Sequence, residues 1–152
     1  MIIRMQPPIP PNLLANMIFP VTPVATAGEL KSKPSWYAAS KIREALVRMD
    51  NDYLRSANDF LQTHPDLSSG GGLSLENFMS PNLGLVSWVR LPTYGADFGW
   101  GQPFYAGPAV VLCEGKSFVL PPALGDEDGS LSLIISLKHE HIEAFQELFY
   151  DI

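Results

Sequence analysis

The stretch Asp97-Phe98-Gly99-Trp100-Gly101 combines one acid, two large aromatic rings and two glycines in five positions. Glycine permits backbone conformations at positive φ, and aromatic rings anchor the elements beside them. Burial of one ring of ~150–250 Å² contributes roughly 4–6 kcal/mol as an upper bound. Two buried rings would rival the net stability of a domain, so the stretch predicts a packed structural corner. The alternative makes Asp97 a general acid or base and Trp100 a ligand platform.

Length and composition indicate one globular domain. The chain has 152 residues, 46% of them hydrophobic, and no apolar run approaches the ~20 residues of a membrane span. The net charge of −6 and the scattered lysines and arginines argue against nucleic acid as a partner. Cys113 is the only cysteine, which excludes a disulfide within the chain and fits a reducing compartment. Because residues 1–5 are too short for a signal peptide, we expect a cytoplasmic location without a membrane partner.

Hydrophobic periodicity and turn residues predict strands and helices that alternate loosely. The expected elements are, in chain order, a strand at 16–19, an irregular edge segment at 21–26, helices at 32–49 and 50–64, a loop at 66–80, a strand at 83–91, a hairpin at 108–120 around a turn at Glu114-Gly115, a strand at 131–137 and a helix at 139–150. The helix from Ser32 presents one apolar face that we expect in the core. The pattern favours the α/β class, with a mixed sheet covered by helices.

Chemistry-bearing motifs are weak in this chain. Gly70-Gly71-Gly72 is not followed by the Lys-Ser/Thr of a phosphate loop. His139 and His141 are alternate residues of an expected helix and point in different directions, which argues against a metal site. Asp126-Glu127-Asp128 has the composition of a solvated turn, and the neighbours of Cys113 predict a buried, inert thiol. The residues by themselves indicate an α/β domain with no self-contained catalytic set.

A family resemblance adds a function to this description. The segments that carry it are Pro7–Pro11, Ala15–Phe19, Ala27–Leu30, Pro81–Leu83, Ser87-Trp88 and Asp97–Gly101. In this order they resemble the C-terminal part of a plant BAHD acyltransferase, and most closely the hydroxycinnamoyl-CoA shikimate/quinate hydroxycinnamoyltransferase branch. The resemblance covers essentially all residues 1–152. It implies the C-terminal domain of the CoA-dependent acyltransferase fold, which is similar to that of chloramphenicol acetyltransferase, with the N-terminal domain absent.

The resemblance also implies an activity. Family members transfer an acyl group from coenzyme A to an alcohol or amine, with no bound cofactor or metal and with acyl-CoA as co-substrate. Their general base is the histidine of a His-x-x-x-Asp motif in the first domain, and no such motif occurs in this chain. We therefore expect these residues alone to be inactive. The alternative is a non-catalytic remnant or a protein-interaction domain. In either case, an exposed domain interface is expected to favour self-association.

Site residues follow from the same resemblance. It implies that the segment Asp97–Gly101 is structural and that Asp97 forms a salt bridge to an upstream arginine, for which Arg4 is the candidate. Trp88 matches a tryptophan facing the active-site channel, although a core ring in a strand explains it equally well. Phe118 matches a ring of the acceptor pocket.

Three positions depart from the branch. Val86 stands where a threonine hydroxyl is typical, and Leu73 replaces an arginine that grips the acceptor carboxylate. Lys116 stands where leucine is usual. The loss of a bidentate arginine argues against shikimate specificity. Lys116 either supplies another cation or is an exposed lysine beside the turn at Gly115.

Overall fold

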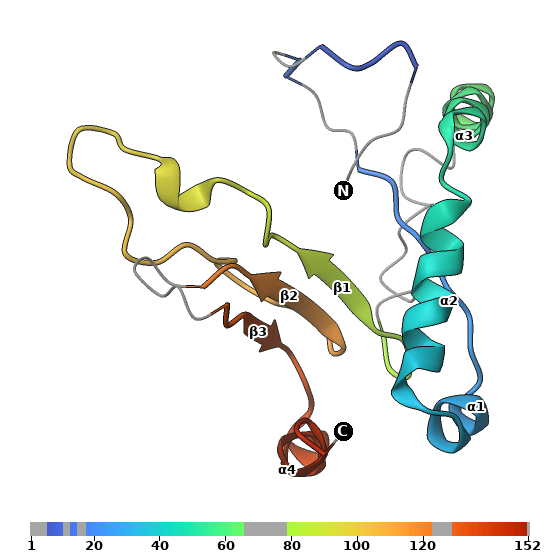
Figure 1. The fold of residues 1–152 in the computed structure, drawn as a ribbon, viewed down its shortest axis with the longest axis vertical. Helices are drawn as coiled ribbons and strands as arrows, with labels where there is room; N and C mark the ends of the chain where they lie inside the picture. The colour runs from blue at the N-terminus through green and yellow to red at the C-terminus, as the bar shows by residue number, and fades with distance from the viewer. Residues whose placement is uncertain (1–5, 11–12, 15–17, 66–78, 123–128, 152) are drawn as a thin grey trace. The chain divides into compact units, whose positions relative to one another are not determined.

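A computed structural model of the chain describes residues 6–10, 13–14, 18–65, 79–122 and 129–151. The chain groups into two compact units, Met1–Gly72 and Leu73–Ile152, and each is described by itself. The first unit contains the helices α1, α2 and α3, and the second contains a sheet and the helix α4 (Figure 1). The expectation of a single domain stays a prediction.

The first unit contains one more helix than the sequence pattern predicted. α1 spans Ala27–Ser32 and α2 spans Ser35–Val47. α2 confirms the helix predicted at 32–49, but the predicted start at Ser32 is wrong, because Ser32 is the last residue of α1. Proline has no N–H and forces the preceding residue into an extended conformation. Lys33 and Pro34 are both extended, and they separate α1 from α2.

A capping box begins α1. The backbone N–H of Glu29 donates to Thr26 Oγ1 at 3.3 Å, and the backbone N–H of Thr26 donates to Glu29 Oε2 at 3.1 Å. The sequence carries this signal as Thr-x-x-Glu, and it could have located the helix. The reciprocal bonds satisfy two N–H groups that have no partner within the helix.

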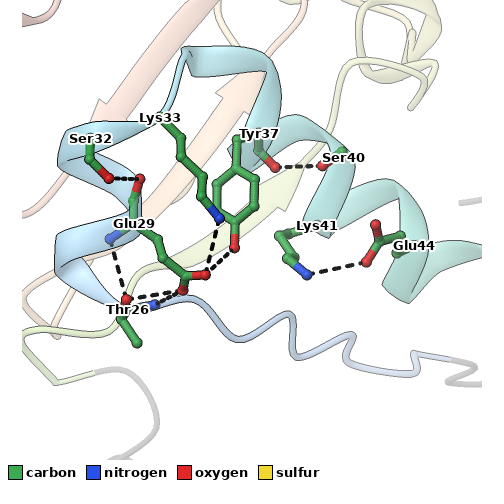
Figure 2. A network of polar contacts seen from close by, with 8 residues as sticks. All are labelled: Thr26, Glu29, Ser32, Lys33, Tyr37, Ser40, Lys41 and Glu44. Carbon is green, nitrogen blue, oxygen red and sulfur yellow. Dashed lines mark hydrogen bonds and ion pairs between the residues drawn. The ribbon is translucent and has the colours of Figure 1, made fainter.

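Glu29 also joins α1 to α2, as Figure 2 shows. The Tyr37 hydroxyl donates to Glu29 Oε1 at 2.9 Å, and Lys33 Nζ lies 3.3 Å from the same oxygen. The hydrogen bond from the Thr26 backbone, followed by those from Tyr37, the Thr26 hydroxyl and Lys33, lowers the pKa of Glu29 to about 2. The Glu29 carboxylate therefore stays charged at pH values well below those at which an ordinary glutamate becomes protonated.

The third helix agrees with its prediction. α3 spans Asn51–Thr63, and the Asp50 side chain caps it by accepting from the Tyr53 N–H at 2.8 Å. Leu54 is its buried residue. The expected strand at 16–19 is wrong at Ile18 and Phe19, which are irregular, and its first two residues lie outside the described ranges.

The apolar face of α2 is not in a core. Trp36 is 67% exposed, and Ile42 and Leu46 are also exposed. The prediction of burial is therefore wrong. Helical periodicity determines which face of a helix is apolar, but a second surface must cover that face before it is buried.

A three-stranded mixed sheet forms the second unit and confirms the α/β class. β1 spans Gly84–Ser87, β2 spans Lys116–Leu120 and β3 spans Ser132–Ile135. β2 lies in the middle, parallel to β1 and antiparallel to β3 (Figure 1). Ser117, Phe118 and Leu120 are buried, so the core of the unit lies along β2.

The predicted hairpin at 108–120 is wrong, although its turn exists. The Lys116 N–H donates to Cys113 O at 3.2 Å and closes the turn at Glu114-Gly115. The Gly115 N–H then donates to Ser136 O at 2.7 Å, and Gly115 O accepts from the Gly84 N–H at 3.0 Å. Both edges of β2 are thus paired with β1 and β3, so no edge is left for residues 108–113.

The last helix is confirmed as α4, His139–Leu148. It lies beyond the end of β3 in Figure 1. Between β1 and β2 the chain also forms a short 3₁₀ helix, η3 (Thr93–Gly95).

Replacing Thr26 with Ala removes the side-chain oxygen that caps α1. We expect the free energy of unfolding of the full chain to fall by about 1 kcal/mol, the ordinary effect of losing an N-cap. Chemical denaturation followed by circular dichroism measures this change. Thr26→Ser keeps the oxygen and is the control, so equal losses in both variants would contradict the role of the cap.

Replacing Gly115 with Ala tests the junction that seats β2. Gly115 has a φ of 78°, and an added Cβ would lie 2.5 Å from the backbone oxygen of Asn82. The left-handed conformation alone costs about 1–2 kcal/mol for an L-residue, and the clash adds to it. We expect a clear loss of stability in denaturant unfolding. Gly28→Ala, whose Cβ meets nothing within 4 Å, is the matched control and should be neutral or slightly stabilising.

Candidate functional site

The candidate channel residues gather on one face of the sheet. Val86 is the register partner of Phe118, and Gly84 is that of Lys116. Side chains alternate between the two faces of a strand, so Val86 and Trp88 share a face with Lys116 and Phe118. The backbone N–H of Trp88 donates to the backbone oxygen of Val119 at 2.8 Å, which extends the pairing of the two strands one residue beyond β1. We call Val86, Trp88, Lys116 and Phe118 the Trp88 face.

Aromatic contact holds the Trp88 face together. The rings of Trp88 and Phe118 meet edge to face, with centroids 5.4 Å apart and an interplanar angle of 73°. This is a favoured geometry for two aromatic rings. Phe118 is buried, whereas Trp88 and Val86 are half-buried. The face therefore combines a fixed ring with a second ring that remains partly accessible.

Lys116 adds a cation to this apolar face. Its Nζ lies 5.6 Å from the centroid of the Phe118 ring, within the range of a cation–π interaction. Its side chain is half-buried. The lysine thus lies along the face and beside the ring.

The segment Asp97–Gly101 forms a corner by a different interaction from the one expected. Phe98 is 81% exposed and Trp100 is 93% exposed, so the prediction that both rings are packed is wrong. Asp97 Oδ1 instead accepts hydrogen bonds from the N–H groups of Gly99 at 2.7 Å and Gly101 at 3.1 Å. Both glycines have positive φ, 97° and 98°. The acid and the glycines make the turn, and Arg4, the candidate partner of Asp97, lies outside the described residues.

A second cluster lies at the turn before β2, and sequence reasoning missed it. His141 Nδ1 lies 2.8 Å from Glu114 Oε1. Lys138 donates its backbone N–H to the same oxygen at 3.4 Å, and Lys138 Nζ lies 3.4 Å from Glu114 Oε2. Residues 114 and 141 are far apart in the chain, so no sequence spacing marks the pair.

This cluster borders a pocket of about 180 Å³. The lining residues are Ser80, Pro81, Asn82, Leu83, Glu114, Gly115, Leu137, His141 and Phe145. The hydrogen bond from His141 is the main cause that lowers the pKa of Glu114, and the nearby Lys138 lowers it further. The arrangement fastens the first turn of α4 to the turn before β2, which is a structural role.

Other sequence candidates do not assemble with these clusters. Gly70–Gly72, Leu73 and Asp126–Asp128 lie outside the described ranges. Cys113 is half-buried. His64 stacks on Phe60 with centroids 4.2 Å apart at the end of α3.

Two findings concern metal and membrane. In the part of the chain that the structure describes, no group of three or more His, Cys, Asp or Glu side chains is placed to hold a metal ion. No helix within the described ranges has the length and apolar character needed to span a bilayer.

Replacing Glu114 with Gln removes the charge that fastens α4. The lowered pKa means that the native state favours the ionised carboxyl, so its stabilising effect is present above the ordinary value of 4.5 and is lost as the pH falls through the lower native value. We expect Glu114→Gln to have a lower Tm than the parent chain at pH 7, and the difference to shrink in acid. Thermal unfolding across this pH range measures it.

Glu140→Gln is the matched control for this experiment. Glu140 is 69% exposed and lies 4.0 Å from both His141 Nε2 and Lys138 Nζ. Its replacement therefore removes a carboxylate near the same two residues, but one that does not make the short contact of Glu114 with His141. A Tm change that is equal in both variants, or independent of pH, would contradict the fastening role of Glu114.

Comparison with known proteins gives the lineage of the chain. The Transferase family profile matches residues 3–152. The chain is 51% identical over 148 residues to shikimate O-hydroxycinnamoyltransferase of Nicotiana tabacum, covering 97% of this chain and 33% of the tobacco protein. It is 50% identical over 151 residues to a hydroxycinnamoyltransferase of Narcissus pseudonarcissus, covering 98% of this chain and 34% of that protein.

A third relative acts on an amine, to judge from its name. Hydroxycinnamoyl-CoA:5-hydroxyanthranilate N-hydroxycinnamoyltransferase of Avena sativa is 49% identical over 149 residues, covering 98% of this chain and 33% of the oat protein. The chain thus spans about a third of the length of the curated relatives it matches. With a family match over nearly its whole length, the chain belongs to the Transferase family, the plant BAHD acyltransferases.

Proposed function

We propose that this chain is the C-terminal portion of an acyltransferase that moves a hydroxycinnamoyl group from coenzyme A to an alcohol or amine acceptor. The observation that carries the proposal is the 51% identity to the tobacco hydroxycinnamoyltransferase over 97% of the chain. The names of the relatives include O- and N-transfer, which supports either kind of acceptor. The single cysteine supports a reducing cytoplasmic setting.

The Trp88 face is the part of the chain that we assign to the substrate channel. It combines two contacting rings, a valine and a cation on one side of a sheet. Apolar walls with a few polar groups are typical of small-molecule sites. Trp88 is half-buried and keeps part of its ring accessible. We assign to it the role of a wall against which the acyl or acceptor group packs, with its indole N–H as a donor.

The chemical step needs a general base, and the motif that carries this base in the family does not occur in these residues. The acceptor loses a proton, its oxygen or nitrogen attacks the thioester carbonyl, and the coenzyme A thiolate leaves. The sequence contains no His-x-x-x-Asp. His141 does not replace that base in our proposal, because its Nδ1 is engaged with Glu114 at 2.8 Å. We therefore propose that the 152 residues alone do not catalyse transfer.

A chimaera tests both parts of the proposal. The purified chain incubated with p-coumaroyl-CoA and shikimate should show no turnover above background. The tobacco relative, with the segment that matches this chain exchanged for it, should be active, because the tobacco protein supplies the remainder of the enzyme. In the chimaera, Trp88→Ala should lower kcat/KM by about tenfold, equivalent to ~1.4 kcal/mol of transition-state stabilisation.

Two variants control for folding. Trp88→Phe keeps an aromatic ring and should retain more activity than Trp88→Ala, while Trp36→Ala removes a tryptophan that lies outside the Trp88 face. Turnover by the chain alone would overturn the claim that the base lies elsewhere. A folded chimaera without activity would instead favour the non-catalytic alternative, a remnant or interaction domain.

A further inference from the structure

The chain between β1 and β2 exposes three large rings in one short stretch. Phe98 is 81% exposed, Trp100 is 93% exposed and Phe104 is 90% exposed. Figure 1 shows this part of the chain as a long loop that extends away from the sheet. We call the three rings and the turn that carries them, residues 97–104, the aromatic loop. Single apolar residues are ordinary on a surface, but exposed rings gathered in this way are typical of a surface that another protein covers.

The same part of the chain carries almost no charge. Across residues 91–113, all of which the structure describes, Asp97 is the only acidic or basic side chain. Its Oδ1 accepts from the N–H groups of Gly99 at 2.7 Å and Gly101 at 3.1 Å, so this carboxylate serves the turn. Depletion of charge and enrichment of aromatic rings distinguish the core of a protein interface from ordinary surface. The surface complementary to the aromatic loop is therefore an apolar protein surface.

The rings are large enough to anchor a stable contact. One buried aromatic ring removes ~150–250 Å² from water, so three rings supply roughly 450–750 Å². One partner of a standard interface contributes about 800 Å². Aromatic anchors also carry much of the binding energy of an interface, while the contacts around them exclude water. The aromatic loop alone thus provides a large part of such an interface.

We propose that the aromatic loop is the docking surface for the part of the acyltransferase that this chain does not match, with Phe98 and Trp100 as the anchors. The chain covers 33% of the tobacco relative, so most of that protein lies outside the match. An interface within one enzyme is permanent, and permanent interfaces are the more hydrophobic class, which fits the lack of charge. The inference rests on the proposed function, because it names the partner surface of the same enzyme.

Hydroxyl-radical footprinting read by mass spectrometry tests the inference, because it measures the oxidation rate of each ring. The samples are the full chain and the chimaera described above. We expect Trp100 to be oxidised about tenfold more slowly in the chimaera, where its exposed ring would be covered. Tyr150, which is 85% exposed outside the aromatic loop, is the reference ring and should react at a similar rate in both proteins. Equal oxidation of Trp100 in the two proteins would overturn the inference.

Substitutions give a second, independent readout. Trp100→Ser and Phe98→Ser should leave the Tm of the chain alone nearly unchanged, since both rings are exposed there, and should lower the Tm of the chimaera by roughly 5 °C. Tyr150→Ser is the matched control and should change both Tm values equally. An equal change in both proteins for Trp100→Ser would contradict the docking role. So would a chimaera that aggregates and becomes soluble with Trp100→Ser, because its ring would then be uncovered.

Other covers of the aromatic loop have their own outcomes. Slow oxidation of Trp100 in the chain alone, together with a dimer in size-exclusion chromatography, would make a second copy the occupant. Slow oxidation in a monomeric chain would make the chain its own cover, and either result overturns the inference. The activity of the chimaera separates this inference from the proposed function. A folded, inactive chimaera with Trp100 protected would refute the proposed function alone, and an active chimaera with Trp100 fully reactive would refute the inference alone.

Discussion

The second unit depends on the backbone of Gly115. Its N–H donates to Ser136 O and its carbonyl accepts from the Gly84 N–H, so one residue joins the strands on both sides of β2. Its φ of 78° turns the chain into the gap between them. This position of Gly115 places β2 between β1 and β3, where it forms hydrogen bonds to both strands. The buried Ser117 adds a bond from its hydroxyl to Gly84 O at 3.2 Å, next to the same junction.

The residues on either side of this glycine have different roles for a geometrical reason. Glu114 lies in the turn, where it meets His141 and Lys138 and holds the first turn of α4. Lys116 is the first residue of β2, and the pleat places its side chain on the Trp88 face. A charge therefore lies in the turn beside α4 at one position and on the Trp88 face two residues later. A shift in register by one residue would exchange the faces of every side chain in β2.

Much of the local structure could be predicted from the sequence. The limits of α3 follow from Asp50 and from its periodicity, and the turn at Glu114-Gly115 follows from its glycine. The missed α1 had a readable signal in Thr26 and Glu29. The corner at Asp97–Gly101 was predicted with the wrong cause, because an acid that accepts two backbone N–H groups makes the turn while both rings stay exposed. Composition cannot distinguish these causes, since a ring stabilises only where another surface covers it.

The sequence by itself determined the helices α3 and α4, the family and the candidate residues Trp88, Phe118, Val86 and Lys116, because local hydrogen bonding and motif order depend on neighbouring residues. Only the tertiary structure decided that β1 pairs in parallel with β2, that these four side chains share one face, and that Glu114 meets His141. The physical reason is that strand pairing and the pairing of distant charges join segments roughly 30 residues apart, whose choice of partner is settled by competition among all available edges and surfaces.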